Sequence, residues 1–123
     1  MMPQLPLQRG DVVYVDLGGA VGTEKQNRRP CVVVQNDDAN RASPLTIVVP
    51  ITDADKQFKG YPQQVFVPAS ELGVGAKNSV IEGGHLRAID REAHIDASVG
   101  VWWHLSDEPI ARVDAALRAS LAL

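Results

Sequence analysis

The stretch that decides the fold is residues 24–37, which read EKQNRRPCVVVQND. Polar and charged residues run up to Arg28 and Arg29, Pro30 follows, and Cys31 then opens a valine run. β-Branched residues that end at an Asn-Asp pair are typical of a short core strand. The sequence therefore places two arginines directly before a hydrophobic strand, and it raises the question of what their guanidinium groups bind.

Further short strands are predicted around this stretch, because runs rich in β-branched and aromatic residues alternate with Gly and Asn/Asp turns. They are 11–17, 31–35, 45–51, 64–67, 79–82 and 85–89, with a tight turn at Gly83 and Gly84 joining the last two. Pro50 cannot donate to a ladder, so the third strand is expected to end there, lie at an edge or carry a bulge. The pattern predicts a mainly β fold, a small barrel or sandwich.

The end of the chain changes to helical spacing. Apolar residues recur there at Ile110, Val113, Leu117 and Leu121. This period predicts an amphipathic C-terminal helix packed on the barrel, with Ser106 as its N-cap and Leu105 and Ile110 as a hydrophobic staple. Asp114 is expected to pair with Arg118 on the exposed side.

Length and composition indicate one globular domain spanning residues 1–123, with 45% apolar and 22% charged residues. The longest nearly apolar run, 45–51, is far shorter than the roughly 20 residues of a membrane span. No secretory leader is recognised, so a cytoplasmic protein is expected. The single cysteine, Cys31, excludes an internal disulfide and is interpreted as a small buried hydrophobe.

The charge is slightly acidic, with 12 basic and 15 acidic residues and a net charge of −3. This balance argues against nucleic-acid binding by global attraction. Residues 1–81 carry eight basic and eight acidic side chains, so the acidic surplus lies in the last third. Lys25, Arg28 and Arg29, with Lys56 and Lys59 farther on, leave two regions locally basic, where a polyanion could be held.

Residues 18–28, GGAVGTEKQNR, form a glycine-rich loop that either becomes ordered on a ligand or is an ordinary exposed hairpin loop. Pro30 restricts Arg29 to extended geometry, which would make its guanidinium a good fork for phosphate. The alternative is that Arg28 and Arg29 are solvated charges beside a strand.

Short motifs follow one another along nearly the whole chain. They are RGDVVYVDL from Arg9, GTE from Gly22, RPCVVVQND from Arg29, NRxSP from Asn40, PIT ending at Thr52, SVI from Ser79, LRAID from Leu86 and the closing ALRASLAL. In this order they closely resemble the MazF/PemK toxins of toxin–antitoxin pairs. The resemblance implies an SH3-like barrel of the MazF/CcdB/Kid type, a homodimer, and metal-independent endoribonuclease cleavage of single-stranded mRNA at a short sequence.

The resemblance also implies the catalytic residues. The family's essential arginine corresponds to Arg29, its essential threonine to Thr52, and its loop acid to Glu24. In such a reaction the 2′-OH attacks the adjacent phosphorus, giving 2′,3′-cyclic phosphate and 5′-OH ends. Arg29 can neutralise the nonbridging oxygens and Thr52 can donate to the same phosphate. Glu24 is the carboxylate to test as base, or else it contacts RNA without proton transfer.

RNA contacts are expected from polar side chains of the loop and of the neighbouring strands. They are Thr23, Lys25, Gln26, Arg28, Lys56, Lys59, Ser79, His85 and Arg87. Relatives commonly read Q-x-R-T-I-D where this chain has His85 and Ala88 in HLRAID. The missing glutamine and threonine put base preference in doubt more than chemistry.

No metal and no cofactor are expected. The three histidines lack zinc-site spacing, and two of them would have to converge to form an acid/base pair. Asp37 with Asp38 and Asp53 with Asp55 are interpreted as turn formers rather than magnesium ligands. Of Trp102 and Trp103, which could stack bases, at least one is expected in the core.

The expected partner is a cognate MazE-like antitoxin, whose acidic disordered tail would fold onto the dimer and cover the RNA groove. Two rivals stay open: a CcdB-like protein that poisons DNA gyrase without catalysis, and a degenerate toxin that only binds antitoxin. Arg29, Pro30 and Thr52 favour the nuclease. The sequence predicts neither the cleavage site nor the identity of the antitoxin.

Overall fold

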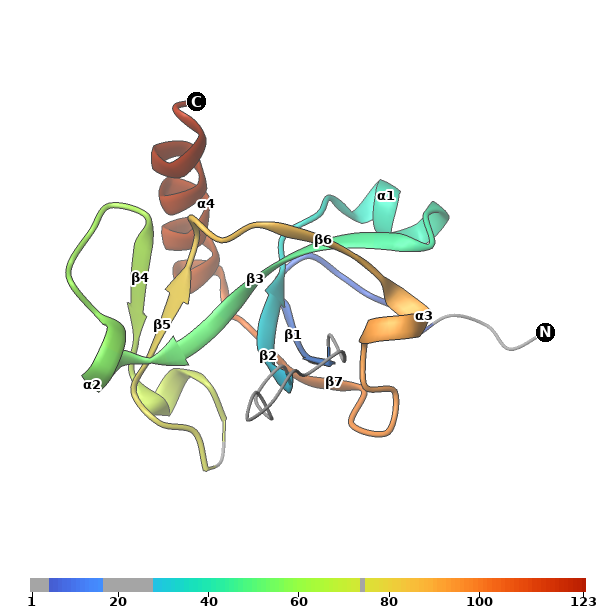
Figure 1. Cartoon of the computed structure of the whole chain (residues 1–123), viewed down its shortest axis with the longest axis horizontal. Helices are drawn as coiled ribbons and strands as arrows, with labels where there is room; N and C mark the ends of the chain where they lie inside the picture. Colours follow the sequence, from blue (N-terminus) through green and yellow to red (C-terminus); the bar gives the residue numbers. More distant parts are fainter. Residues whose placement is uncertain (1–4, 17–27, 74) are drawn as a thin grey trace, which may run out of the picture.

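The computed structural model describes residues 5–16, 28–73 and 75–123, so most of the glycine-rich loop lies outside it. Short helices lie between several of the strands, and a longer helix ends the chain (Figure 1). In order they are β1 (Asp11–Asp16), β2 (Arg28–Val33), α1 (Asp37–Ala42), β3 (Leu45–Asp53), α2 (Ala54–Gln57), β4 (Gln64–Val67), the 3-10 turn η1 (Ala69–Glu71), β5 (Ser79–Glu82), β6 (Arg87–Asp90), α3 (Arg91–His94), β7 (Val101–His104) and α4 (Asp107–Leu121).

The strands form one curled antiparallel sheet in the order β4-β5-β3-β2-β1-β7, with β6 pairing β3. β3 is the central strand: its start pairs with β6 and its end with β5. The expected strand at 31–35 begins earlier, at Arg28, because Val15 and Asp16 of β1 pair with Arg29 and Arg28. The arginine pair therefore lies within β2 and not before it.

The tight turn expected at Gly83 and Gly84 does join β5 to β6, but the two strands pair with β3 and not with each other. Between the pairs Val48–Arg87 and Ile51–Ile81, β3 has two residues and the opposite chain has five, 82–86. The extra residues of the segment 82–86 form a turn in which the His85 amide donates to the Glu82 carbonyl at 3.1 Å. β3 runs through Pro50 without ending, because the mismatch leaves no ladder partner waiting for its missing N–H.

Both faces of the central strands are buried. Val12, Val32 and Val49 belong to the core beneath α4, whereas Val13, Val33 and Val48 belong to a second core on the opposite face. Alternate residues of a strand point to opposite faces. Two cores therefore explain why the valine run is continuous instead of alternating with polar residues, and Cys31, at 4% exposure, fits the buried role expected of it.

The C-terminal helix is found as predicted and stands beside β4 (Figure 1). Val113 is buried on its inner face, but Leu121 is 52% exposed, so the apolar stripe ends sooner than expected. Ser106 occupies the N-cap without a side-chain hydrogen bond. Asp114 pairs with Arg9 at 2.7 Å, and not with Arg118, because the residues just before β1 lie against this helix.

The sequence did not predict β7 or the one-turn helices. β7 pairs with β1, and Trp102 packs against the first core and edge-on to Tyr14, so one tryptophan does lie inward as expected. The turn residues interpreted at 36–38 begin α1, where the Asn36 side chain accepts from the Ala39 amide. Among the helices that the structure describes, none is long and apolar enough to cross a membrane.

Candidate active site

A solvent-open cavity of about 540 Å³ lies where the end of β3 meets β2, α2 and the β5–β6 turn. We call it the cationic basin, and Arg28, Arg29, Ile51, Thr52, Asp53, Lys56, Gln57, Glu82 and His85 line it. A second cavity of about 240 Å³ shares Arg29 and His85 and is lined further by Arg87. The two cavities together give one surface, floored by Pro50 and bordered by cations, on which a chain of phosphates can lie.

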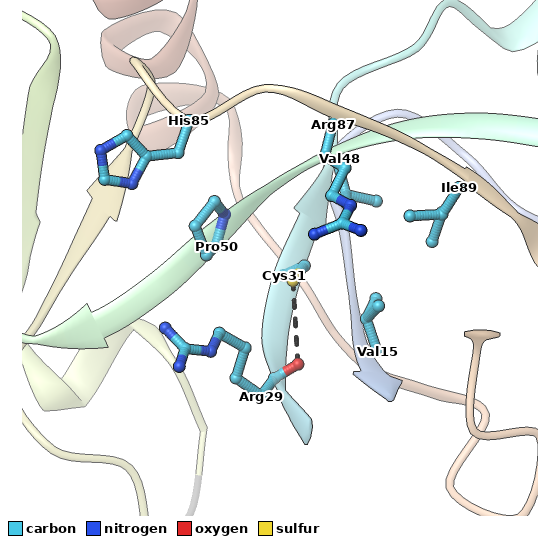
Figure 2. A pocket seen from close by; sticks show the side chains of 8 residues that line it. All are labelled: Val15, Arg29, Cys31, Val48, Pro50, His85, Arg87 and Ile89. Carbon is cyan, nitrogen blue, oxygen red and sulfur yellow. Dashed lines mark hydrogen bonds between the residues drawn. The ribbon is translucent and has the colours of Figure 1, made fainter. Parts of the chain in front are cut away.

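Arg29 projects from β2 into this surface (Figure 2). Its backbone is held on both sides, because it pairs with Val15 of β1 and its carbonyl accepts a weak bond from the Cys31 thiol at 3.8 Å. The guanidinium is exposed and therefore accessible to a ligand. A strand position, fixed by pairing, directs this arginine more firmly than the loop position that the sequence suggested.

Thr52 shares its face of the sheet with Pro50 and Val48, and it lines the basin beside Arg29. Its hydroxyl oxygen is buried and finds no hydrogen-bond partner among the described residues. An unsatisfied buried polar group costs about 1–3 kcal/mol. The hydroxyl can therefore gain from a partner that the free protein does not supply, provided that the side chain rotates toward the basin.

His85 occupies the five-residue turn opposite Pro50 and lines both cavities. Figure 2 shows His85 and Arg29 on either side of Pro50, with both side chains extending past it. The turn is anchored by Gly83, whose amide donates to the Gln63 carbonyl at 2.8 Å. A Cβ on Gly83 would lie 2.8 Å from that oxygen and 3.1 Å from the Ala116 Cβ, so only glycine fits.

Arg28 differs from its neighbour because alternation turns its side chain to the other face of β2. Its guanidinium binds the Asp96 carboxylate, with Nη2 at 2.8 Å and Nε at 3.1 Å, and it lies 4.5 Å from the Tyr14 ring centroid. Hydrogen bonds from Ser98 and then from Arg28 lower the pKa of Asp96 to about 2. Arg28 therefore lines the basin with a guanidinium that already binds groups within the protein.

The structure brings together some of the residues expected to contact RNA and separates others. Lys56, His85 and Arg87 line the two cavities with Arg29. Ser79 lines a third cavity, which shares Thr52 and Asp53 with the basin, and its hydroxyl donates to the Lys77 carbonyl at 2.8 Å. Lys59 lines neither cavity. Four expected site residues lie outside the described part of the chain: Thr23, Glu24, Lys25 and Gln26.

Other reactive groups are accounted for by local contacts. Burial raises the pKa of the Cys31 thiol to about 12, and the charge of Arg29 only partly opposes this, so Cys31 is not a nucleophile. His94 contacts the Asp16 carbonyl at 3.1 Å and His104 the Asp11 carboxylate at 2.7 Å. Among the described residues no three His, Cys, Asp or Glu side chains gather as metal ligands. Metal independence stays a prediction.

Two acidic residues of the basin were missed by sequence reasoning. Asp53 caps α2, accepting from the Asp55 amide at 2.9 Å, and so positions the helix that carries Lys56. Glu82 is buried and accepts from the Gln64 side chain at 3.2 Å. The pattern Asp53-x-Asp55 signalled a turn, as interpreted, but nothing local showed that this turn borders the basin.

The curled antiparallel sheet and the cationic basin define a small β-barrel protein with a site suited to a phosphate-bearing ligand. Residues 8–121 match the family described as PemK-like, MazF-like toxin of type II toxin–antitoxin system. The chain is also 41% identical over 117 residues to endoribonuclease EndoA of Bacillus subtilis strain 168, covering 95% of this chain and 96% of that protein. The chain belongs to the PemK/MazF toxin family, as its motifs suggested.

Solved structures agree on the fold. The chain is similar to an endoribonuclease in complex with its cognate antitoxin from Mycobacterial species, with a TM-score of 0.74, 18% identity and coverage of 95% of this chain and 96% of that one. It is similar to MazF from Deinococcus radiodurans, with a TM-score of 0.69, 25% identity and coverage of 95% and 97%. The mainly β, SH3-like barrel of the MazF type, expected from the sequence, is confirmed.

Proposed function

We propose that this protein cleaves single-stranded mRNA at a short sequence without a metal ion, with Arg29 and Thr52 acting on the scissile phosphate. The protein is an endoribonuclease toxin, the class to which its family and its 41% identical relative belong. The observation that carries the residue assignment is that Arg29 and Thr52, far apart in sequence, line one basin with Lys56 and His85.

The geometry suits a phosphorane. Attack of the 2′-OH on the adjacent phosphorus places extra negative charge on the nonbridging oxygens. A guanidinium fork presented from a fixed strand offers paired donors to these oxygens, and the Thr52 hydroxyl adds a further donor. Products with 2′,3′-cyclic phosphate and 5′-OH ends follow from this route. Glu24 stays a prediction as base or RNA contact.

The basin also explains how an acidic protein holds RNA. Arg29, Lys56 and Arg87 supply local positive charge, and Asp53 and Glu82 are both engaged as acceptors within the protein. A groove that tracks the backbone binds single strands without help from net charge. Thr23, Lys25 and Gln26 are proposed to extend this groove from the loop.

A cognate MazE-like antitoxin is proposed to neutralise the toxin by covering this groove, in a cytoplasmic complex with a homodimer of single-domain chains. Support for the antitoxin comes from the family and from the solved structures described as a toxin with its cognate antitoxin. Dimer mass is measured by sedimentation of the purified toxin. A monomer at all concentrations would reject the dimer.

The experiment is cleavage of a long, unstructured RNA by purified protein in excess EDTA, beside Arg29→Ala and Thr52→Ala, with both product ends mapped. We expect the parent protein to cut at one short motif and to leave cyclic phosphate and 5′-OH ends. We expect no such cuts from either variant. Absence of cleavage across diverse RNAs by folded, antitoxin-free protein would overturn the proposal and favour the non-catalytic rivals, for which gyrase binding is the next assay.

A further inference from the structure

The basin holds one side chain whose chemistry the proposed phosphate contacts do not use. Arg29, Lys56 and Arg87 are cations that donate hydrogen bonds, and Thr52 supplies a hydroxyl donor. A 2′-OH becomes a good nucleophile only when its proton is accepted. The described part of the basin must therefore be searched for a proton acceptor.

The two carboxylates are poor candidates because each already accepts hydrogen bonds within the protein. Asp53 accepts from the Asp55 amide at 2.9 Å as the cap of α2. Glu82 is only 7% exposed, and both its oxygens lie 3.2 Å from the Gln64 amide nitrogen. Proton transfer by either group would disturb a contact that holds the basin together.

His85 meets the requirements that the carboxylates do not. It is exposed, it lines both cavities with Arg29, and its ring has no hydrogen-bond partner among the described residues. The other two histidines are held by Asp16 and Asp11. Histidine in general changes charge between pH 5 and 8, and its neutral ring accepts a proton through one nitrogen.

We infer that His85 is the general base of this enzyme, taking the proton of the attacking 2′-OH while Arg29 holds the phosphate. The O2′–P bond forms, the P–O5′ bond breaks with its electron pair on O5′, and O5′ takes a proton from solvent. The imidazolium then returns its proton to solvent. This inference rests on the proposed function, and it gives His85 the role that sequence reasoning offered to Glu24.

The fold supplies the precision that proton transfer needs. His85 follows the buried Gly83, which is hydrogen-bonded to Gln63 and packed against Ala116 of α4. The mismatch of five residues against two raises this turn over Pro50, where the ring and the Arg29 guanidinium border the same cavities. A base on the β5–β6 turn and a phosphate clamp on β2 can thus approach one substrate linkage from two sides.

The test compares His85→Gln with the parent in single-turnover cleavage of an oligonucleotide carrying the mapped site. Glutamine keeps a polar side chain of the family's usual type but cannot accept the proton. The rate is expected to fall by about 10²–10⁴-fold, the usual contribution of general acid–base catalysis. Affinity for the same RNA with a 2′-deoxy nucleotide at the cut should stay unchanged. If weaker affinity accounts for the whole loss, His85 only contacts RNA and the inference fails.

The pH profile tests the role directly. The parent rate should rise with pH and level off as the base becomes neutral, whereas His85→Gln should rise without levelling. The charged groups that line the two cavities with His85 are Arg28 and Arg29 of β2, Asp53 of β3, Lys56 of α2, Glu82 of β5 and Arg87 of β6. Arginine, lysine and carboxylates ordinarily keep their charge from pH 5 to 8. The inference would be overturned if the cleavage rate of His85→Gln still reached a plateau at high pH, or if only Glu24→Gln lost that plateau.

A substrate with sulfur in place of the 5′-bridging oxygen separates base from acid. Sulfur leaves without needing a proton, so the loss in His85→Gln should persist with this substrate. Rescue by sulfur would make His85 the acid and overturn the inference. His94→Gln is the matched control and should cleave like the parent. If the parent itself cleaves no RNA, the proposed function is wrong. If the parent cleaves RNA and His85→Gln cleaves it at the same rate, only the inference about His85 is wrong.

Discussion

The two adjacent arginines of β2 lie on opposite faces of the strand and make different contacts. Both arginines are exposed and both line the basin, but the Arg28 guanidinium binds the Asp96 carboxylate and lies against the Tyr14 ring. Arg29, on the other face of β2, borders the basin with Thr52 and His85. The same residue type, one position apart, is therefore proposed to act mainly within the protein in one case and on a ligand in the other. The comparison teaches that strand alternation separates two side chains that residue type alone does not distinguish.

The largest expected effect tests the open side. Arg29→Ala should lower the cleavage rate by about 10²–10³-fold, the range found when a transition-state donor is removed. Thermal stability should stay close to that of the parent, because the side chain is exposed. Arg28→Ala is the matched control and should retain most activity. Equal losses of activity in the two variants would abolish the contrast between the faces.

The second prediction concerns Thr52→Val, which removes a hydroxyl without changing the side chain's shape. Loss of a hydrogen bond to a charged phosphate, about 1.5–3 kcal/mol, corresponds to roughly a 10- to 100-fold slower reaction. Because the hydroxyl has no partner among the described residues, unfolding in denaturant should show no loss of stability. A less stable variant would mean that the hydroxyl serves the fold.

The third prediction separates the two glycines of the β5–β6 turn. Gly83→Ala forces a Cβ against the Gln63 carbonyl and Ala116, and overpacking of this kind costs about 1–3 kcal/mol. The Cβ of Gly84→Ala would meet the flexible Gln63 side chain at 3.2 Å and the Ser120 hydroxyl at 3.8 Å, and this substitution should cost less. Denaturant unfolding measures both. If the two variants were equally stable, the turn would not be anchored at Gly83.

The fourth prediction tests the contact between Arg28 and Tyr14. Arg28→Ala removes the contact with Tyr14, and cation–π contacts at exposed sites contribute about 0.5–1 kcal/mol. In a double-mutant cycle with Tyr14→Leu, measured by thermal unfolding, the free energies of unfolding should show a favourable coupling between the two side chains. Independent effects of the two substitutions would show that the ring and the guanidinium do not interact in solution.

The smallest effect is a pH dependence. The pKa of Asp96 is lowered to about 2 from 3.8, so the ionised form is favoured by folding. Its contribution is therefore complete above pH 3.8 and is lost as the pH falls toward 2. Titration of the Asp96 carboxyl carbon by NMR should show the low pKa. In Arg28→Ala the pKa should rise only in part, because the Ser98 hydrogen bonds remain.

Much of the site could be predicted because its motif residues are local in sequence. Arg29 before Pro30 and Thr52 at the end of a strand are recognised in the chain itself, and both lie in the basin. Ser79, opposite Asp53 in the sheet, lines a neighbouring cavity that shares Thr52 and Asp53 with the basin. Lys59 lines neither the basin nor the cavity beside it, because a basic run does not reveal which of its members reaches a site. Both RNA contacts stay predictions.

The sequence by itself determined the family, the mainly β composition and the C-terminal helix, and it singled out Arg29 and Thr52 as candidate catalytic residues. These follow from local patterns and from motif order. Only the tertiary structure decided that Arg28 and Arg29 diverge, because pairing with β1 draws them into the strand. It also decided that His85 stands over Pro50, because the five-against-two mismatch arises between chain segments that meet only on folding.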